Sequence, residues 1–383
     1  MESMSRDEAR QVIVNAHLGT TAFDASDVLR KERVIQLDGL SRVEKSHRLT
    51  CAARLGAMEP IAEVDRLLWS DGQAVSFETY THAACLFPID DWPLLDLARQ
   101  KARARKDAPS PGAMDAVLEV VADCPNGATR RQLETSTDRS EGWGWSDRKR
   151  AAEHLVWRGE LICSTRRSGR RVYDLPQRRL PESILRQKPT QDEILERLVH
   201  AALAVLGVVT ADDIAHHYNL DLESVLRGIE LTKAVPVQVE GWDTRAYALP
   251  DADTTKRSHA PRLIGPFDNL LRNRARALRV FDFDYTFEAY KPARSRVYGP
   301  YAMVVLDQNR FIGRVDAQRI GKDLSFLEIF PEPMEDPGKV TDAAQSAGET
   351  LATQLGGALE FSVSVSERAI SGLTDAATGR MSD

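Results

Sequence analysis

The sequence is poor in cysteine and lacks the patterns that cysteine-based sites require. Its four cysteines are scattered, as Cys51, Cys85, Cys124 and Cys163. No two of them form a Cys-x-x-Cys pair, and none lies in a His/Cys cluster at zinc spacing. We therefore expect a reduced, cytoplasmic protein without a structural metal, iron–sulfur cluster or other cofactor.

Long apolar runs are also missing. The first eight residues contain acidic side chains where a signal peptide needs a basic region followed by an apolar one. No later window approaches about eighteen unbroken apolar residues. Neither export nor membrane insertion is expected.

The chain as a whole has no excess of positive charge, because its formal net charge is −6, but its charges are unevenly distributed. Five of the eight residues 99–106 are basic, and residues 127–180 contain thirteen basic and seven acidic residues. Residues 262–300 contain eight basic and four acidic residues, whereas residues 328–383 contain three and ten. This segregation indicates a phosphate-binding face on an acidic body, with solvated helix faces as the alternative.

Length and apolar spacing predict several domains. With 383 residues, 42% hydrophobic and 28% charged, the chain has the composition of a globular protein of about two to four domains. Capping signals and apolar spacing predict helices over residues 6–18, 24–32 and 43–55. Further helical patterns cover residues 61–69 and 77–86, and residues 99–112 have the composition of a linker.

Two consecutive segments, residues 113–176 and 190–250, resemble each other. Each predicts three helices followed by two strands, and each ends in Tyr-x-Leu-Pro. This order is typical of a winged helix. We predict an α+β, mainly helical fold of tandem winged-helix modules followed by a small antiparallel β-sheet or barrel. The expected domains are an N-terminal winged-helix-like domain (1–107), a second (108–187) and third (188–258) winged helix, and a barrel-like domain with a terminal helix (259–383).

In a winged helix the third helix can enter the major groove of DNA while the wing contacts phosphates. Arg148, Lys149, Arg170 and Arg171 suit these roles in the second module. The third module has a nearly neutral wing, so it is either architectural or a protein–protein module.

The C-terminal region changes to short alternating runs. They predict strands over residues 281–288, 301–306 and 310–316, a turn at 307–309 and a helix over 343–359. Tyr290, Tyr298 and Tyr301 alternate with basic side chains, which suits either stacking on nucleobases or ordinary positions in strands.

A short apolar run over residues 34–40 carries two polar side chains, Gln36 and Asp38. In an extended strand these two side chains share one face, while Ile35 and Leu37 pack behind them. Gly39 predicts that the strand ends in a turn, which leaves Asp38 near an opening. The alternative is an amphipathic strand with a hydrated face.

Several short motifs follow one another in an order that is more specific than any one of them. They are Gln36-Leu37-Asp38; Ser46-His47-Arg48-Leu49 with Arg54-Leu55-Gly56; Tyr80-x-His82-Ala83-Ala84 with Leu86-Phe87-Pro88; Gly265-Pro266-Phe267-Asp268-x-Leu270-Leu271 with Arg274; Phe283-x-Tyr285-x-x-Glu288-x-Tyr290-x-Pro292; Arg296-x-Tyr298-Gly299-x-Tyr301; and Ile312-Gly313-Arg314-Val315-Asp316. Over most of its length the chain resembles the winged-helix DNA glycosylases typified by AlkZ and YcaQ (AlkX). Its Gln-apolar-Asp motif is similar to the YcaQ-like branch. The chain departs from the family at Arg272, where Trp is expected, and at Val304, where Pro is expected.

The resemblance implies a catalytic pair, Gln36 and Asp38, and a substrate, double-stranded DNA containing alkylated or crosslinked purines. Asp38 could stabilise a sugar cation and accept a proton from water, while Gln36 orients that water. We expect a monofunctional glycosylase of base excision repair, monomeric and located in the cytoplasm at the nucleoid. The candidate DNA contacts are His47, Arg54, Arg148, Lys149, Arg170, Arg171, Arg274, Arg276, Lys291 and Arg296. Two other functions fit the pattern: a winged-helix transcription regulator with a ligand-sensing C-terminal domain, and a protein-interaction scaffold.

Overall fold

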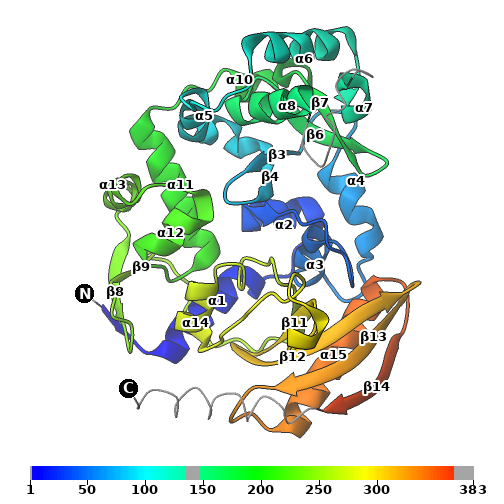
Figure 1. Ribbon diagram of the computed structural model, residues 1–383. Helices are drawn as coiled ribbons and strands as arrows, with labels where there is room; N and C mark the ends of the chain where they lie inside the picture. The colour runs from blue at the N-terminus through cyan, green and yellow to red at the C-terminus, as the bar shows by residue number, and fades with distance from the viewer. Residues whose placement is uncertain (1, 135–145, 366–383) are drawn as a thin grey trace, which may run out of the picture. The chain divides into compact units, whose positions relative to one another are not determined.

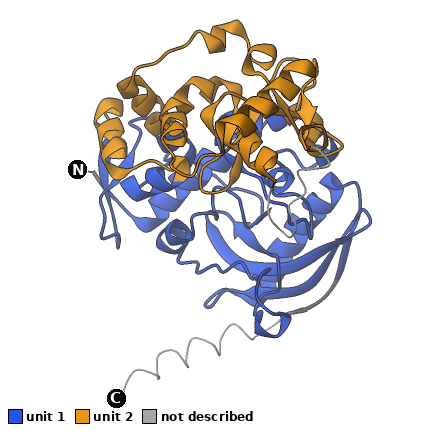
Figure 2. Cartoon of the chain, turned by 45° about the horizontal axis from the view of Figure 1, so that its top comes forward, with its two compact units in different colours: residues 1–64, 202–216, 234–383 blue, residues 65–201, 217–233 orange. Residues whose placement is uncertain are grey.

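The computed structural model describes residues 2–134 and 146–365 of the chain, which form a mixed α+β fold (Figure 1). The chain divides into two compact units, coloured separately in Figure 2. Unit 1 comprises residues 1–64, 202–216 and 234–383, and unit 2 comprises residues 65–201 and 217–233. Within the described ranges, no helix is both long and apolar enough to cross a membrane.

Unit 1 begins with the helices that the sequence predicts. Helix α1 (Arg6–Leu18) starts at a capping box in which Ser5 and Glu8 bond each other's backbone N–H. Helix α2 (Ala25–Glu32) is capped by Asp24, and the short strand β2 (Ile35–Gln36) leads to α3 (Ser46–Ala52) and to the 3₁₀ turn η1 (Ile61–Glu63). The predicted third helix is therefore shorter than expected.

The C-terminal part of unit 1 is a five-stranded sheet in the order β10–β11–β12–β13–β14. Its strands are β10 (Arg262–Ile264), β11 (Ala302–Asp307), β12 (Arg310–Ile320), β13 (Asp323–Pro331) and β14 (Leu359–Val365). The first four are antiparallel, and the predicted turn after Asp307 joins β11 to β12, whereas β14 pairs parallel with β13. The described residues thus form an open mixed sheet, and the helix expected to end the domain, α15 (Pro337–Gln354), is followed by another strand.

The strand expected over residues 281–288 is absent from the described structure. Helix α14 (Arg274–Phe281) ends at Phe281, and residues 282–292 form an irregular segment before the 3₁₀ turn η3 (Ala293–Ser295). Phe283 and Tyr285 alternate with polar residues because their side chains, 1% and 4% exposed, pack into the core of unit 1. Here the alternation of apolar and polar residues reflects which side chains are buried, although the backbone forms no strand.

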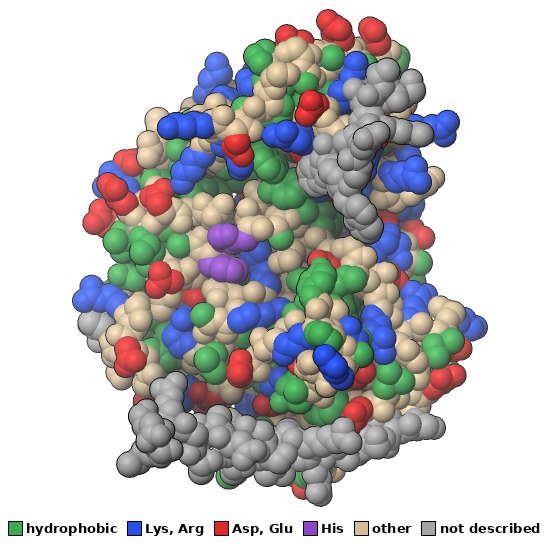
Figure 3. All heavy atoms as spheres, viewed as in Figure 1, with side chains coloured by type: hydrophobic (Ala, Val, Ile, Leu, Met, Phe, Trp, Pro, Cys, Tyr) green, Lys and Arg blue, Asp and Glu red, His purple; other side chains and the backbone are tan. Residues whose placement is uncertain are grey.

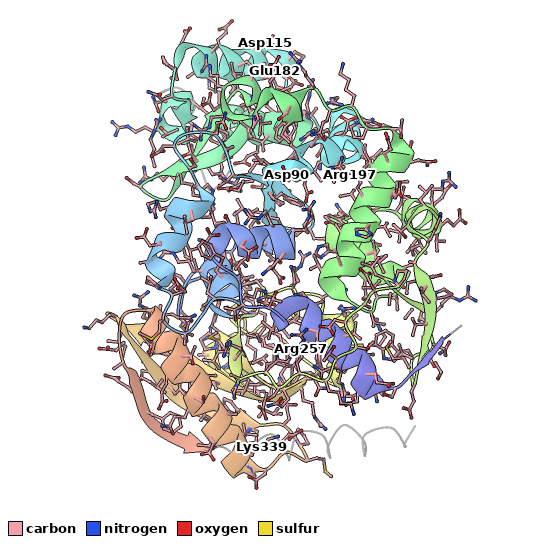
Figure 4. All side chains as sticks on the ribbon, turned by 180° about the vertical axis from the view of Figure 1, so that it is seen from behind. Asp90, Asp115, Glu182, Arg197, Arg257 and Lys339 are labelled. Atoms are coloured by element: carbon pink, nitrogen blue, oxygen red, sulfur yellow. The ribbon has the colours of Figure 1, made fainter. Side chains whose placement is uncertain are left out.

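A second sheet of unit 1 joins residues that are far apart in the sequence. Strand β1 (Glu2–Met4) pairs parallel with β8 (Val235–Val239), which pairs antiparallel with β9 (Ala246–Ala248). The segment of residues 251–261 then runs along α1. Asn15 donates to the main-chain carbonyls of Asp253 and Thr255, and Arg257 (labelled in Figure 4) donates to the main-chain carbonyl of Gly19.

The predicted third module contains helices α11 (Gln191–Leu206), α12 (Ala211–Tyr218) and α13 (Leu222–Thr232) before β8 and β9. Its residues are divided between the two units. The order of its elements is the predicted one, and its assignment as a winged helix stays a prediction.

Unit 2 begins with α4 (Val64–Leu68) and a hairpin of β3 (Ser76–Tyr80) and β4 (Ala84–Pro88). The helix predicted over residues 77–86 is therefore wrong, because the aromatic and threonine side chains of this stretch favour a strand. The 3₁₀ segment η2 (Ile89–Leu95) and helix α5 (Asp96–Arg103) follow, so part of the predicted linker is helical.

The remainder of unit 2 has the predicted order of three helices and a hairpin. Its elements are α6 (Pro111–Asp123), β5 (Ala128–Thr129), α7 (Arg130–Leu133), α8 (Asp147–Arg158), β6 (Ile162–Arg167), β7 (Arg170–Asp174), α9 (Pro176–Arg179) and α10 (Glu182–Leu185). Gly159 ends α8 with a positive φ of 73°, and Ser168 and Gly169, with φ of 49° and 74°, make the tight turn of the hairpin.

Candidate active site

The two polar residues of the Gln36-Leu37-Asp38 motif are held through their main chains by one serine. Strand β2 ends at Gln36, and Ser46 at the start of α3 donates its hydroxyl to the Gln36 carbonyl at 2.7 Å. The same oxygen accepts the main-chain N–H of Asp38 at 2.8 Å. Ser46 is 3% exposed, whereas Gln36 and Asp38 are partly exposed. The backbone is therefore fixed from the buried side, and Gln36 and Asp38 remain partly exposed.

Asp38 lies outside the strand, which ends at Gln36, so the predicted extended strand carrying Gln36 and Asp38 on one face is wrong, whereas the predicted turn at Gly39 is present. The carboxylate Oδ1 of Asp38 accepts the N–H of Leu40 at 2.8 Å, which makes a tight turn at Gly39. This bond orients the carboxylate and leaves it an acceptor with further lone pairs.

The segment that follows Asp38 is attached to strand β12. The N–H of Arg319 donates to the Arg42 carbonyl at 3.0 Å, and Nε of Arg42 donates to the Ala317 carbonyl at 3.3 Å. Glu44, 7% exposed, accepts from Arg319 at 2.5 Å and lies 3.4 Å from Arg48. The turn that carries Asp38 is thus bonded to Ser46 at Asp38 and to strand β12 at Arg42.

A hydroxyl group just before β11 and a carboxyl group on β12 belong to this region. Tyr301 is 1% exposed, and within the described residues its hydroxyl has no hydrogen-bond partner. Burial, together with Tyr285 and the negative charge of Asp38, raises the pKa of Tyr301. The carboxyl group of Asp316 has a raised pKa because its burial outweighs the attraction of Arg42, 3.5 Å away.

A buried ionic cluster lies behind the motif, between α1, α2, α3 and the segment before α14. Arg54 donates to both oxygens of Asp268, at 2.6 and 2.9 Å, and to Glu32 at 2.5 Å. His17 Nδ1 lies 2.9 Å from the same Glu32 carboxylate. The exposed fractions of these four residues are between 1% and 5%.

Asn269 connects this cluster to the motif. Its amide donates to the Glu32 carboxylate at 2.8 Å and to the main-chain carbonyl of Val34 at 2.9 Å, two residues before Gln36. Between them, Arg33 has a φ of +58°, a value that side chains other than glycine rarely adopt. The cluster therefore determines where β2 begins and in which direction it leaves α2.

The charges of the cluster support one another. Burial alone would raise the pKa of Glu32, but the charges of Arg54 and His17 and their hydrogen bonds outweigh it and hold that pKa well below its ordinary value. Burial alone would lower the pKa of Arg54, and Asp268 and Glu32 raise it instead. Both groups are therefore charged at neutral pH.

Comparison with known proteins shows to which protein family the chain belongs. The family model for AlkZ-like DNA glycosylases matches residues 29–355, which include the motif, Arg54 and Asp268. The chain belongs to the AlkZ-like DNA glycosylase family. The solved structure of the DNA glycosylase AlkZ from Streptomyces sahachiroi is similar, with a TM-score of 0.66 and 21% sequence identity over 96% of this chain and 100% of that chain. At this identity the likeness shows a shared fold.

Three of the candidate DNA contacts of this AlkZ-like glycosylase lie inside unit 1. His47 is 2% exposed, Arg54 is 4% exposed in the ionic cluster, and Arg276, 2% exposed, pairs with Asp213 at 2.9 Å. Such burial does not fit the DNA-contact role that the sequence predicted for them. Arg54 and Arg276 are instead held in buried ion pairs.

The other candidates in unit 1 are partly exposed but engaged. Arg274 stacks on Tyr285 and donates to the carbonyls of Leu271 and Pro266. Lys291 pairs with Glu288, and Arg296 donates to three main-chain carbonyls of its own loop.

In unit 2, Arg171 takes part in a network of ion pairs with two glutamates. Its side chain is 18% exposed and pairs with Glu78 at 2.6 Å and Glu153 at 2.9 Å. Arg170, on the same strand, is exposed, and Arg148 and Lys149 are partly exposed in the first turn of α8. Arg148, Lys149 and Arg170 remain the candidates for phosphate contacts in this part of the AlkZ-like glycosylase.

Sequence reasoning missed the positioning residues. Ser46 stood in a recognised motif without a role, and Asn269 occupied an unassigned position between Asp268 and Leu270. The only available signal was their place inside family motifs, because their partners are remote in sequence. Within residues 2–134 and 146–365 no group of His, Cys, Asp and Glu could hold a metal ion.

The ionic cluster predicts how stability depends on pH. A carboxyl group whose folded pKa is lowered stabilises the fold above its unfolded pKa, and this stability is lost as pH falls through the folded pKa. Glu32 should therefore contribute fully at neutral pH and progressively less below about pH 4. Urea unfolding between about pH 7 and pH 3 measures this, with Glu32→Gln as the comparison. An equal loss of stability in both proteins would contradict the assignment.

Proposed function

We propose that this AlkZ-like glycosylase is a monofunctional enzyme that removes alkylated purines from DNA, with Gln36 and Asp38 as its catalytic pair. The observation that carries the proposal is the Ser46 hydroxyl, which bonds the main chains of both residues at 2.7 and 2.8 Å. The backbone positions of the residues that carry the carboxylate and the amide are thereby fixed, while both residues remain partly exposed. This arrangement suits a reaction in which one group supplies charge and the other positions water.

The chemistry of the substrate explains why these two groups suffice. An N7-alkylated guanine carries a positive charge, so the base leaves without being protonated by a general acid. The transition state is then a sugar with oxocarbenium character that water must attack. Asp38 stabilises the cation and accepts the proton from water, and the Gln36 amide orients that water. Neither side chain can form an imine with the sugar, so the reaction ends with an abasic site and an unbroken strand.

The partly exposed motif also suits crosslinked substrates. Most enzymes that act on a base rotate its nucleotide out of the duplex into a closed pocket. A base that is covalently tethered to the opposite strand cannot make this movement. A catalytic pair carried on a turn at the surface can reach the sugar without it, and we therefore include the unhooking of interstrand crosslinks in the proposal.

DNA binding in this proposal uses residues 108–187 as a winged helix. The first turn of α8 would lie at the major groove, and the hairpin of β6 and β7 would follow the phosphates. Arg148, Lys149 and Arg170 are the contacts, and Arg171 supports the hairpin from within.

A gel assay tests the proposed reaction. The protein is incubated with duplexes containing N7-methylguanine or a nitrogen-mustard crosslink, and the products are heated with base to cleave abasic sites. We expect cleavage that depends on the heating step. Cleavage before heating would contradict a monofunctional mechanism, and no cleavage of any alkylated duplex would contradict the proposed function.

Ser46 provides a graded test of the same proposal. Ser46→Ala removes the hydroxyl that joins Gln36 and Asp38, and we expect the single-turnover excision rate to fall about five- to tenfold, the scale of one neutral hydrogen bond. Affinity for undamaged duplex should change little, because no phosphate contact is lost. Ser46→Thr, which retains the hydroxyl, should recover part of the rate. An unchanged rate in Ser46→Ala would show that the bridge is dispensable.

A further inference from the structure

The loop between α14 and β11 holds one exposed tyrosine on a rigid frame. Tyr290 is 81% exposed, although its neighbour Glu288 is 2% exposed. The Glu288 carboxylate accepts the main-chain N–H groups of Val297 and Tyr298 at 2.7 and 2.9 Å and pairs with Lys291 at 2.9 Å. A buried carboxylate thus joins the two sides of the loop.

Arg296 closes the loop from its other end. Its guanidinium donates to the main-chain carbonyls of Glu288, Ala289 and Lys291, at 3.1, 3.1 and 3.0 Å. These bonds surround Tyr290 in the sequence and fix its backbone. A rigid exposed ring loses little conformational freedom when it stacks on a partner.

The Tyr290 ring also continues a row of aromatic side chains that leads to the motif. Its edge-to-face contact with Phe287 has a centroid distance of 6.0 Å, and Phe287 contacts Tyr301 at 5.8 Å. The same loop also ends beside the motif: Gly299 packs against the carboxylate of Asp316, which lies 3.5 Å from Arg42, four residues after Asp38. Tyr298, by contrast, lies between Arg314 and Phe330. Of the three tyrosines in this stretch, Tyr290 has the exposed ring.

The surroundings of Tyr290 are basic. Residues 289–298 contain Lys291, Arg294 and Arg296 and no acidic residue, and Lys291 is paired with the preceding Glu288. Figure 3 shows Lys and Arg side chains beside hydrophobic ones over the place where Figure 1 draws this loop in yellow. An aromatic ring among cations is the combination with which proteins bind unpaired nucleobases and their phosphates.

We infer that Tyr290 stacks on a nucleobase exposed where the base stack of the DNA is interrupted, next to the sugar that Gln36 and Asp38 attack. This inference rests on the proposed function, because it assigns the partner of the same site. An abasic site, the product of the reaction, is such an interruption. The loop would therefore recognise a gap in the stack and hold the duplex open beside the catalytic pair.

Binding to an uncleavable abasic analogue tests the inference. A duplex containing tetrahydrofuran, with 2-aminopurine opposite it, reports both affinity and stacking, and an intact duplex is the reference. Tyr290→Ala should weaken binding to the tetrahydrofuran duplex about tenfold and abolish the quenching of 2-aminopurine, with less than about a twofold change on intact duplex. Tyr290→Phe keeps the ring and should behave as wild type. Met334→Ala, at a fully exposed residue before α15, is the matched control.

The outcomes separate this inference from the proposed function, because tetrahydrofuran carries no base to excise. Equal weakening on both duplexes in Tyr290→Ala, or unchanged quenching, would overturn stacking even if wild-type protein excises alkylated bases. Tyr290-dependent binding together with a wild-type protein that excises no alkylated base would overturn the glycosylase proposal and leave the stacking contact.

Discussion

Replacing Asp38 with Asn is expected to lower the single-turnover rate of base excision by about 100-fold or more, the scale of one electrostatic stabiliser in an active site. Asn is nearly isosteric and keeps the Oδ1 acceptor that bonds the N–H of Leu40. The turn should therefore keep its shape, and the negative charge alone is lost. Excision of N7-methylguanine with enzyme in excess measures the effect without a contribution from product release.

Two controls determine what such a loss means. DNA affinity of Asp38→Asn, measured on the same duplex, should stay within about threefold of wild type, because the proposal gives Asp38 no phosphate contact. Asp342→Asn removes an exposed carboxylate on α15 and should leave the excision rate unchanged. Full activity of Asp38→Asn with intact binding would exclude Asp38 as the catalytic carboxylate.

Replacing Arg54 with Met is expected to lower the free energy of unfolding by about 3 to 5 kcal/mol, the usual result of breaking a buried ion pair from one side. Glu32 and Asp268, 1% and 2% exposed, would keep buried charges without their common partner. Urea unfolding at neutral pH measures the loss. The excision rate should fall as well, because Asn269 transmits the position of Glu32 to Val34.

Matched substitutions separate burial from charge. Arg30→Met removes an arginine that is 56% exposed and lies 3.7 Å from Asp27, and it should cost less than about 0.5 kcal/mol. Adding Asp268→Asn and Glu32→Gln to Arg54→Met should recover part of the stability, because no buried charge then remains uncompensated at these positions. Equal effects of Arg30→Met and Arg54→Met would contradict the buried cluster.

Local signals in the sequence predicted local structure well. The Ser5/Glu8 capping box starts α1, and the turn after Asp307 joins β11 to β12. The family motifs also singled out Gln36 and Asp38 as candidates, and the hydroxyl of one serine bonds the main chains of both. Each of these features depends on residues no more than ten positions apart in the sequence.

Features that depend on distant partners could not be predicted. The sequence shows that Arg54 and Arg276 are basic, but their burial depends on Asp268 and Asp213, which lie 214 and 63 residues away. The alternation of Phe283 and Tyr285 is that of a strand, whereas packing against the core places them in an irregular segment. Charge and alternation are local properties, and the choice between surface and interior is made by the tertiary structure.

The discontinuity of unit 1 sets the time at which the enzyme acquires its active site. Val34 receives its bond from Asn269, 235 residues later in the chain. At about 5 to 20 residues per second, a ribosome needs about 10 to 50 s to make the intervening chain. Throughout this interval the Gln36/Asp38 segment has been synthesised without the bond from Asn269 that supports it. Because unit 1 joins residues so far apart in the sequence, we expect it to assemble more slowly than locally formed elements, and the segment to take its final position only after residue 269 has been made.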